Sequence, residues 1–274
     1  MPRPYASILR KAEAFHAAAR VLLACGLALA QTPSLAADCP AATTLQYEVL
    51  EQRPHSQQAF TQGLTFAAGQ LVESTGLYGQ SRLILHTPAG SQHSALPQHR
   101  FGEGLAWFDQ RLWQLSWKAG ELRIYRLQPL RLDAIWRYRG EGWGLTHDGE
   151  HFIMSDGSAE LLIRRSEDFE LLRRIRVRDG AKPLPHLNEL EWIEGQVWAN
   201  VWQQDRIARI DPHSGCVSGW LQLHELWPRM IRPRTSDVLN GIAWHPKKRE
   251  FWVTGKNWPR LYRLKIDALH GDKS

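Results

Sequence analysis

Five residues suited to chemistry or recognition recur along the chain at intervals of 41, 40, 45 and 52 residues: Gln62, Glu103, Trp143, Asn188 and Asn240. A carboxyl group held among aromatic side chains can have a raised pKa, and it can then transfer protons near neutral pH. Carboxamides bind polar groups by hydrogen bonds, and tryptophan supplies an apolar wall. If the fold brings these five side chains together, they form a site for acid–base chemistry on a small ligand.

The segments around these positions predict how they are brought together. Each position opens a short apolar strand. About twelve residues after the position that follows it comes a residue of a second strand: Thr75, Ser116, Asp156, Val201 and Thr254. Turn-forming residues lie between the strands, at 68–69, 147–149, 194–195 and 246–248. Further strands are predicted at 83–86, 122–127, 161–165, 207–210 and 261–266. Helical periodicity is nearly absent after residue 40, and a short helical insertion is predicted only at 221–227.

A repeat of 40 to 50 residues with four strands per unit is typical of a β-propeller. We therefore expect an all-β fold: a five-bladed β-propeller of four-stranded antiparallel blades around a central channel. The first strand of each blade lines the channel in such a fold, so the five residues should meet at one mouth. Glycines follow four of them and should let the inner strands approach closely: Gly63, Gly104, Gly144 and Gly241.

The N-terminus resembles an export signal. Arg3, Arg10, Lys11 and Arg20 precede or flank an apolar run at 21–30, and small residues follow at 34–36. We expect residues 1–36 to be a signal peptide and 37–274 to be a single propeller domain. The protein would then be periplasmic or secreted, with no stable membrane insertion after signal removal. Asp38 before Cys39 disfavours lipidation.

The charge of the mature chain is modest. The formal net charge of +6 falls to +3 without residues 1–36. The sequence has no stripe of Lys and Arg with interleaved aromatic residues, the pattern that would indicate nucleic-acid binding. A cluster of arginines is interpreted as the solvated outer face of two strands: Arg164, Arg165, Arg173, Arg174, Arg176 and Arg178.

Cysteine usage agrees with export. Cys25 lies within the signal, which leaves Cys39 and Cys216. An even pair in an oxidising compartment favours a disulfide that ties the N-terminal strand to a late turn. Two free thiols are the alternative.

Ten motifs in order make the chain resemble the glutamine cyclotransferase family of plants and bacteria, from Tyr47 to about Tyr262. They are AFTQGL (59–64), ESTGLYGQS (73–81), FGEGL (101–105), QLSW (114–117), EGWGLT (141–146), MSDGS (154–158), LNELEW (187–192), ANVW (199–202), DVLNGIA (237–243) and VTGKNWP (253–259). The chain departs from the family at Ser56, where the family has Asp, and at Ser116, where it has Thr. The first departure questions a role for an acid at position 56.

The resemblance implies a glutaminyl-peptide cyclotransferase, an acyltransferase that converts N-terminal glutamine to pyroglutamate with release of ammonia. The α-amine of the substrate attacks its own γ-amide, so the enzyme orients this nucleophile and need not supply one. The remaining tasks are proton transfer and stabilisation of the oxyanion. The resemblance implies Glu103 as proton shuttle, Asn188 as holder of the γ-amide and Lys256 as oxyanion stabiliser. Structural roles near the axis or at the surface are the alternatives for these three residues.

A substrate-binding wall is expected around the glutamine side chain. Its predicted members are Phe60, Gln62, Phe101, Trp117, Trp143 and Trp202. Other tryptophans are interpreted as packing between blades: Trp107, Trp136, Trp192, Trp244 and Trp252.

Metal-binding signals are weak, since the histidines are scattered and no zinc motif occurs. No cofactor is expected to be required, and the resemblance implies zinc independence, with a structural calcium possible in the central channel. The expected partners are peptides or proteins with N-terminal glutamine, and the expected state is a monomer. Two alternatives stay open: a non-catalytic Trp-lined propeller that binds peptides or sugars, and a calcium-dependent lactonase-like propeller.

Overall fold

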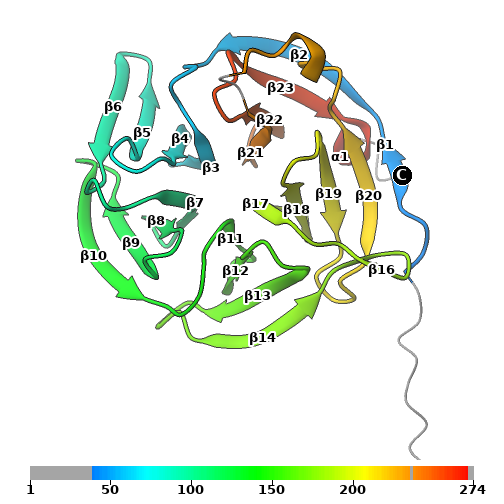
Figure 1. The fold of residues 1–274 in the computed structure, drawn as a ribbon, viewed down its shortest axis with the longest axis horizontal. Helices are drawn as coiled ribbons and strands as arrows, with labels where there is room; N and C mark the ends of the chain where they lie inside the picture. The colour runs from blue at the N-terminus through cyan, green and yellow to red at the C-terminus, as the bar shows by residue number, and fades with distance from the viewer. Residues whose placement is uncertain (1–38, 235–236, 271–274) are drawn as a thin grey trace, which may run out of the picture. The chain divides into compact units, whose positions relative to one another are not determined.

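Short strands that are neighbours in sequence pair into five antiparallel sheets around a common axis (Figure 1). The computed structural model describes residues 39–234 and 237–270. The first blade consists of β3 (Thr61–Ala67), β4 (Gln70–Thr75), β5 (Arg82–Thr87) and β6 (Gly90–Ala95), and the second of β7 (Gly102–Phe108), β8 (Arg111–Ser116), β9 (Glu121–Arg126) and β10 (Arg131–Arg137). The third blade consists of β11 (Leu145–His147), β12 (His151–Met154), β13 (Glu160–Arg165) and β14 (Leu171–Arg176), and the fourth of β17 (Leu187–Ile193), β18 (Gln196–Val201), β19 (Arg206–Ile210) and β20 (Val217–Gln222). The fifth blade consists of β21 (Leu239–His245), β22 (Glu250–Gly255) and β23 (Arg260–Ile266), together with β2. The predicted five-bladed propeller is confirmed.

The last blade is completed from the other end of the chain. Its outer strand is β2 (Tyr47–Pro54), which pairs antiparallel with β23. The preceding strand, β1 (Thr43–Leu45), adds in parallel to the outer strand β20 of the fourth blade. Figure 1 shows both N-terminal strands running along the outside of these two blades. The N-terminal segment therefore closes the ring and enlarges one blade to five strands.

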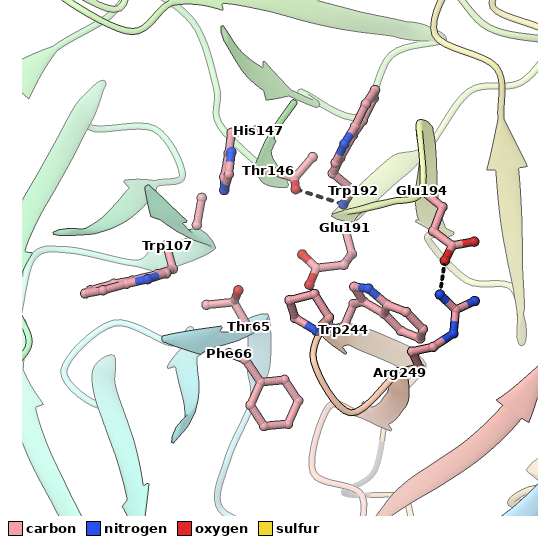
Figure 2. A pocket seen from close by; sticks show the side chains of 12 residues that line it. Thr65, Phe66, Trp107, Thr146, His147, Glu191, Trp192, Glu194, Trp244 and Arg249 are labelled. Carbon is pink, nitrogen blue, oxygen red and sulfur yellow. Dashed lines mark hydrogen bonds and ion pairs between the residues drawn. The ribbon is translucent and has the colours of Figure 1, made fainter. Parts of the chain in front are cut away.

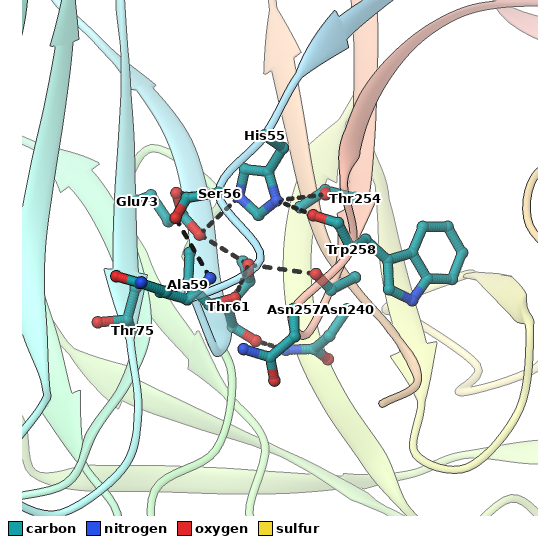
Figure 3. A network of polar contacts seen from close by, with 12 residues as sticks. His55, Ser56, Ala59, Thr61, Glu73, Thr75, Asn240, Thr254, Asn257 and Trp258 are labelled. Carbon is teal, nitrogen blue, oxygen red and sulfur yellow. Dashed lines mark hydrogen bonds and ion pairs between the residues drawn. The ribbon is translucent and has the colours of Figure 1, made fainter. Parts of the chain in front are cut away.

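Ring closure is reinforced by a buried polar network just after β2 (Figure 3). Nε2 of His55 lies beside the carboxylate of Glu73 on β4, and its Nδ1 lies 2.7 Å from the carbonyl oxygen of Trp258. The hydroxyl of Thr61 donates to the same carboxylate at 2.7 Å. The network thus joins the first blade to the last.

The hydrophobic core lies between the blades. Within the described residues, the buried apolar side chains form five clusters, and each contains residues of two adjacent blades. The five tryptophans interpreted as packing residues lie in or against these clusters: Trp107, Trp136, Trp192, Trp244 and Trp252. Three of them, Trp107, Trp192 and Trp244, also line a cavity at the end of the axis opposite to the predicted site.

The inner strands β3, β7, β11, β17 and β21 stand next to the axis (Figure 1). A Cβ added at Gly63 would lie 2.7 Å from the backbone nitrogen of Leu105, so glycine is required at this approach. The fourth blade has Glu189 at the equivalent place, with no exposed surface. Its two carboxylate oxygens accept N–H groups of Leu64 and Ile242 from two other inner strands. This side chain occupies the space between the inner strands β3, β17 and β21.

Two sequence interpretations are wrong in detail. Residues 221–227 form no helix: 221–222 end β20, and the neighbouring helical turn is the 3-10 helix η1 (Arg229–Ile231). Arg164 is not solvated, because it is 6% exposed and its guanidinium lies 4.9 Å from the ring centroid of Phe169.

The alignment of the fifth blade is shifted by one residue. Gly255, not Thr254, stands opposite the start of its inner strand, as Thr75 and Ser116 do in the first two blades. Lys256 consequently occupies the same place in its blade as Trp117 in the second.

The remaining elements are small. The pair β15 (Arg178–Asp179) and β16 (Lys182–Pro183) follows the third blade, and the single turn α1 (Asp267–His270) follows β23. Cys39 and Cys216 are joined by a disulfide with a Cα–Cα distance of 5.4 Å, which ties the segment before β1 to the start of β20. The proposed signal peptide lies outside the described residues. Among the helices of the described residues, none is long and apolar enough to cross a membrane.

Candidate active site

Irregularities at the start of the inner strands position the predicted site residues. The pairing of β3 with β4 skips Gln62, and in β7 two residues, Glu103 and Gly104, face a single residue of β8. The same shift occurs at 188–189 in β17 and at 240–241 in β21. An extra residue of this kind bends the strand and redirects its side chain. The bulges therefore turn these side chains toward the mouth of the channel.

One cavity of about 360 Å³ opens at this mouth. All nine residues predicted as catalytic or substrate-binding line it: Phe60, Gln62, Phe101, Glu103, Trp117, Trp143, Asn188, Trp202 and Lys256. Leu77 and Asp237 complete the lining. The structure thus brings the predicted set together from five blades, and the chemical roles of the nine residues stay predictions.

Asn240 belongs to the supporting layer. It is fully buried, and its amide donates to the carbonyl oxygen of Thr61 at 2.9 Å and to Oε1 of Gln62 at 3.3 Å. It fixes the orientation of Gln62 instead of lining the cavity.

Aromatic rings form most of the wall. Phe101 meets Phe60 edge-on at a centroid distance of 6.2 Å and lies 5.4 Å from Trp117. On the other side, Trp143 and Trp202 are perpendicular at 5.8 Å. Such edge-to-face contacts stabilise ring orientations. The wall can enclose a short aliphatic chain such as that of glutamine.

A carboxylate outside the sequence-predicted set holds two of these rings. Oε2 of Glu141 accepts the indole N–H of Trp117 at 2.7 Å and that of Trp143 at 3.1 Å. Glu141 lies in the loop before β11, two residues before Trp143, and Lys118 lies 3.7 Å from its other oxygen. Its place within the EGWGLT motif was the available signal, but a contact that bridges two blades is not visible in a sequence.

Glu103 is the buried acid of the cavity. It is 4% exposed, and its Oε1 accepts a hydrogen bond from the amide of Gln62 at 3.0 Å. Burial raises its pKa well above the ordinary range, the charge of Lys256 opposes this, and Glu141 adds to it. A raised pKa favours the protonated carboxyl group, which can donate a proton and take one back.

Lys256 is a buried cationic residue in the lining of the same cavity. Its ammonium lies 4.8 Å from the ring centroid of Phe60, and the side chain is 4% exposed. Burial lowers its pKa, while the charges of Glu103 and Asp237 oppose that shift. Asp237 was missed from the sequence because it precedes the inner strand, and only the backbone pairing of Asp237 and Val238 with Lys256 brings it to the cavity.

Asn188 has an unsatisfied acceptor. Its side chain is 1% exposed, and within the described residues its Oδ1 is buried without a hydrogen-bond partner. A buried carbonyl oxygen without a donor is costly, and a ligand N–H in the cavity would satisfy it.

The calcium implied by the resemblance finds little support in the side chains of the axis. Among the described residues, no group of three His, Cys, Asp or Glu is close enough to hold a metal ion. Both oxygens of Glu189 are occupied by backbone N–H donors. These donor-bound oxygens do not fit a carboxylate-rich calcium site.

Comparison with known proteins agrees with this geometry. A sequence model described as glutamine cyclotransferase matches residues 20–266. A glutaminyl-peptide cyclotransferase of Arabidopsis thaliana is 39% identical over 228 residues, which are 81% of this chain and 71% of the relative. The crystal structure of Myxococcus xanthus glutaminyl cyclase superposes with a TM-score of 0.74 at 32% identity, covering 82% of this chain and 98% of that one. The chain therefore belongs to the glutamine cyclotransferase family.

Proposed function

We propose that the protein cyclises N-terminal glutamine of peptides and proteins to pyroglutamate and releases ammonia. The observation that carries the proposal is the cavity itself, in which a buried Glu–Gln pair, a buried Lys and an Asn with an unsatisfied oxygen face an aromatic wall. Family membership supports the same reaction.

Orientation is the first task of the site. The γ-carboxamide of glutamine and its α-amine must fold toward each other, and a narrow aromatic pocket favours such a compact conformation. The unsatisfied Oδ1 of Asn188 is suited to accept an N–H of the γ-carboxamide. We assign Asn188 the role of fixing that amide relative to the α-amine.

Proton transfer is the second task. Attack of the α-amine forms the C–N bond of the lactam, and the α-nitrogen must lose a proton while the departing nitrogen gains one to leave as ammonia. Glu103 can deliver its own proton to the departing nitrogen and take one from the α-nitrogen, ending in the state in which it began. The raised pKa suits this shuttle, and the Gln62 amide holds the carboxyl group in place.

Stabilisation of the tetrahedral oxyanion is the third task. Lys256 carries the buried ammonium of the cavity lining, and a positive charge in a desolvated site stabilises developing negative charge strongly. We assign it this role, with Asp237 helping to keep it protonated.

The alternative functions are less well supported. Family membership does not favour a non-catalytic propeller that binds peptides or sugars. A calcium-dependent lactonase needs an oxygen-ligand set, and the described residues provide no group of three acidic or histidine side chains for one.

The cellular setting is also proposed. The signal-like N-terminus and the Cys39–Cys216 disulfide support export to the periplasm or beyond, where disulfides persist. The radial repetition of blades leaves only short strand edges at the outside, which supports a monomer. We propose that catalysis requires no zinc.

The decisive experiment is an ammonia-release assay on a peptide that begins with glutamine. Mass spectrometry should show the loss of one ammonia from the peptide, and the same peptide with an acetylated N-terminus should stay unchanged. Ligand binding without ammonia release would support the non-catalytic alternative instead.

A further inference from the structure

The opposite mouth of the channel carries a second, unassigned cavity of about 470 Å³ (Figure 2). In four of the five blades its lining begins three residues further along the chain than the first site, at Thr65, Ala106, Thr146 and Glu191. In every blade the residue four positions after the repeat residue (Gln62, Glu103, Trp143, Asn188 or Asn240) is aromatic. These aromatic residues are Phe66, Trp107, His147, Trp192 and Trp244. The cyclisation chemistry uses none of these side chains.

The two cavities are separate. Glu189 stands between them on the axis, has no exposed surface and is bonded to two neighbouring inner strands. Glu191, two residues further along β17, belongs to the second cavity.

Glu191 points into the middle of the second cavity (Figure 2). The residue is 8% exposed, and its Oε1 accepts the backbone N–H of Trp244 at 2.8 Å. Within the part of the chain that the structure describes, its second oxygen has no hydrogen-bond partner. Other polar groups are mostly engaged, since Thr146 accepts the N–H of Trp192 and Arg249 pairs with Glu194 at the rim. The cavity therefore presents one available carboxyl oxygen within an aromatic wall.

We propose that this second cavity binds a small organic cation, such as a quaternary or protonated amine, between the aromatic rings and the Glu191 carboxylate. Tryptophan faces attract cations most strongly among the aromatic side chains, and the attraction grows when the site is desolvated. A sugar would need several hydrogen-bond partners, and this lining offers few. The volume suits a compact ligand.

The ionisation of Glu191 gives the proposal a second readout. Burial raises its pKa to about 8, and the N–H of Trp244 opposes the shift. The charged or titratable neighbours are Glu189 on its own strand, His147 on β11 and the Glu194–Arg249 pair. Burial lowers the pKa of His147 and raises that of Glu189, so burial disfavours the charged form of both. β3 and β7 contribute no titratable side chain to the lining, and His245 on β21 packs against Phe66. A bound cation favours the ionised carboxylate, so binding at neutral pH should release a proton from Glu191.

The test uses choline and its neutral isostere, in which a quaternary carbon replaces the nitrogen. Calorimetric titration of the intact protein should show choline binding roughly tenfold more tightly than the isostere. The heat should depend on the ionisation enthalpy of the buffer, which reports proton release. Glu191→Gln can still accept the Trp244 N–H, and it should weaken choline binding by roughly tenfold and abolish proton release while cyclisation continues.

Two controls separate this site from the first. Trp143→Ala changes the other mouth and should leave choline binding unchanged, and a Gln-initiated peptide should not displace choline. Equal binding of choline and the isostere, undetectable choline binding, or displacement by the peptide would each overturn the proposal. If Glu191→Gln does not fold, the comparison of choline with the isostere on the unaltered protein still decides.

Discussion

Nε2 of His55 lies 3.1 Å from Oε1 of Glu73, and both side chains are only 1% exposed. The other ring nitrogen of His55 faces the carbonyl oxygen of Trp258, so both nitrogens face acceptors, as in a protonated ring (Figure 3). Burial lowers the pKa of His55, but the charge and hydrogen bond of Glu73 outweigh it and the net pKa is raised. Burial also opposes ionisation of Glu73, yet His55, His86 and Thr61 hold its pKa far below the ordinary value.

This pair should make ring closure depend on pH. The raised pKa of His55 contributes stability below its unfolded value of about 6.5, and this is lost as pH rises through the folded pKa. The lowered pKa of Glu73 contributes stability above about 4.3, and this is lost as pH falls through its folded pKa. The loss in melting temperature caused by His55→Asn should therefore be largest between these two values. An exposed histidine, His93→Asn, is the control, and a loss that is constant from acid to alkaline pH would contradict the prediction.

Replacing the proposed proton shuttle should reduce the rate of chemistry. Glu103→Gln keeps the shape of the side chain but removes its titrating proton, so kcat should fall by roughly 10²-fold or more while KM changes little. Steady-state ammonia release measures both constants. Glu191→Gln, a carboxyl group at the other mouth, is the matched control. A folded Glu103→Gln enzyme with near-normal kcat would shift the principal role to Asn188 or Lys256.

Removing part of the aromatic wall should weaken substrate binding instead. Trp143→Ala removes a large apolar surface and should raise KM by roughly tenfold or more. Glu141→Ala should also raise KM, by a smaller factor, because Trp117 and Trp143 lose their shared acceptor. Glu141→Gln retains one acceptor oxygen and should lie between Glu141→Ala and the native enzyme. A change confined to kcat in Glu141→Ala would argue against a positioning role.

Chelators should leave cyclisation nearly intact. The described residues contain no group of three His, Cys, Asp or Glu arranged for a metal, and the proposed proton and charge transfers use side chains alone. Activity is measured before and after treatment with EDTA and with a zinc-selective chelator. A complete loss that added zinc restores would refute zinc independence, and restoration by calcium alone would place a structural ion in the protein.

The Cys39–Cys216 bridge should persist in exported protein and stabilise it. It closes a separation of 177 residues, and such a cross-link restricts the unfolded chain. Non-reducing mass spectrometry should find no alkylatable thiol at either position, and reduction should lower the melting temperature by several degrees. Cys39→Ser with Cys216→Ser should show the same lower value with and without reductant. Two reactive thiols in the native protein would be the opposite outcome.

Equivalent positions in the repeat predicted much of the candidate site. Gln62, Glu103, Trp143 and Asn188 were found because each begins a repeated pattern of a polar or aromatic residue, a second residue that is usually glycine, and an aliphatic residue. Trp117 and Trp202 followed from their positions at the ends of second strands, and the role of Lys256 was also implied by the family resemblance. The one-residue shift in the fifth blade was missed because its turn, between His245 and Glu250, is two residues longer than the turn between Ala67 and Gln70 in the first blade.

Contacts between distant segments were the part that sequence could not supply. The sequence shows that Glu189 stands where the other four blades have glycine. It does not show that the carboxylate accepts the N–H groups of Leu64 and Ile242 on two other strands. Asp237 reaches the cavity through backbone pairing with the Lys256 segment. Three tryptophans of the second mouth, Trp107, Trp192 and Trp244, were interpreted as packing residues, and they do pack against the hydrophobic clusters as well as line the cavity.

The pairing of β2 with β23 has a consequence for how the chain reaches its final form. Tyr47 stands opposite Ile266, so one of the first strands to be synthesised pairs with the last. Until β23 arrives, the open edges of a growing arc of blades can recruit other chains. Contacts over such long separations also slow folding, because the loop entropy must be lost before the contact forms. Chains shortened by even part of β23 should therefore accumulate as open, aggregation-prone arcs rather than as slightly smaller propellers.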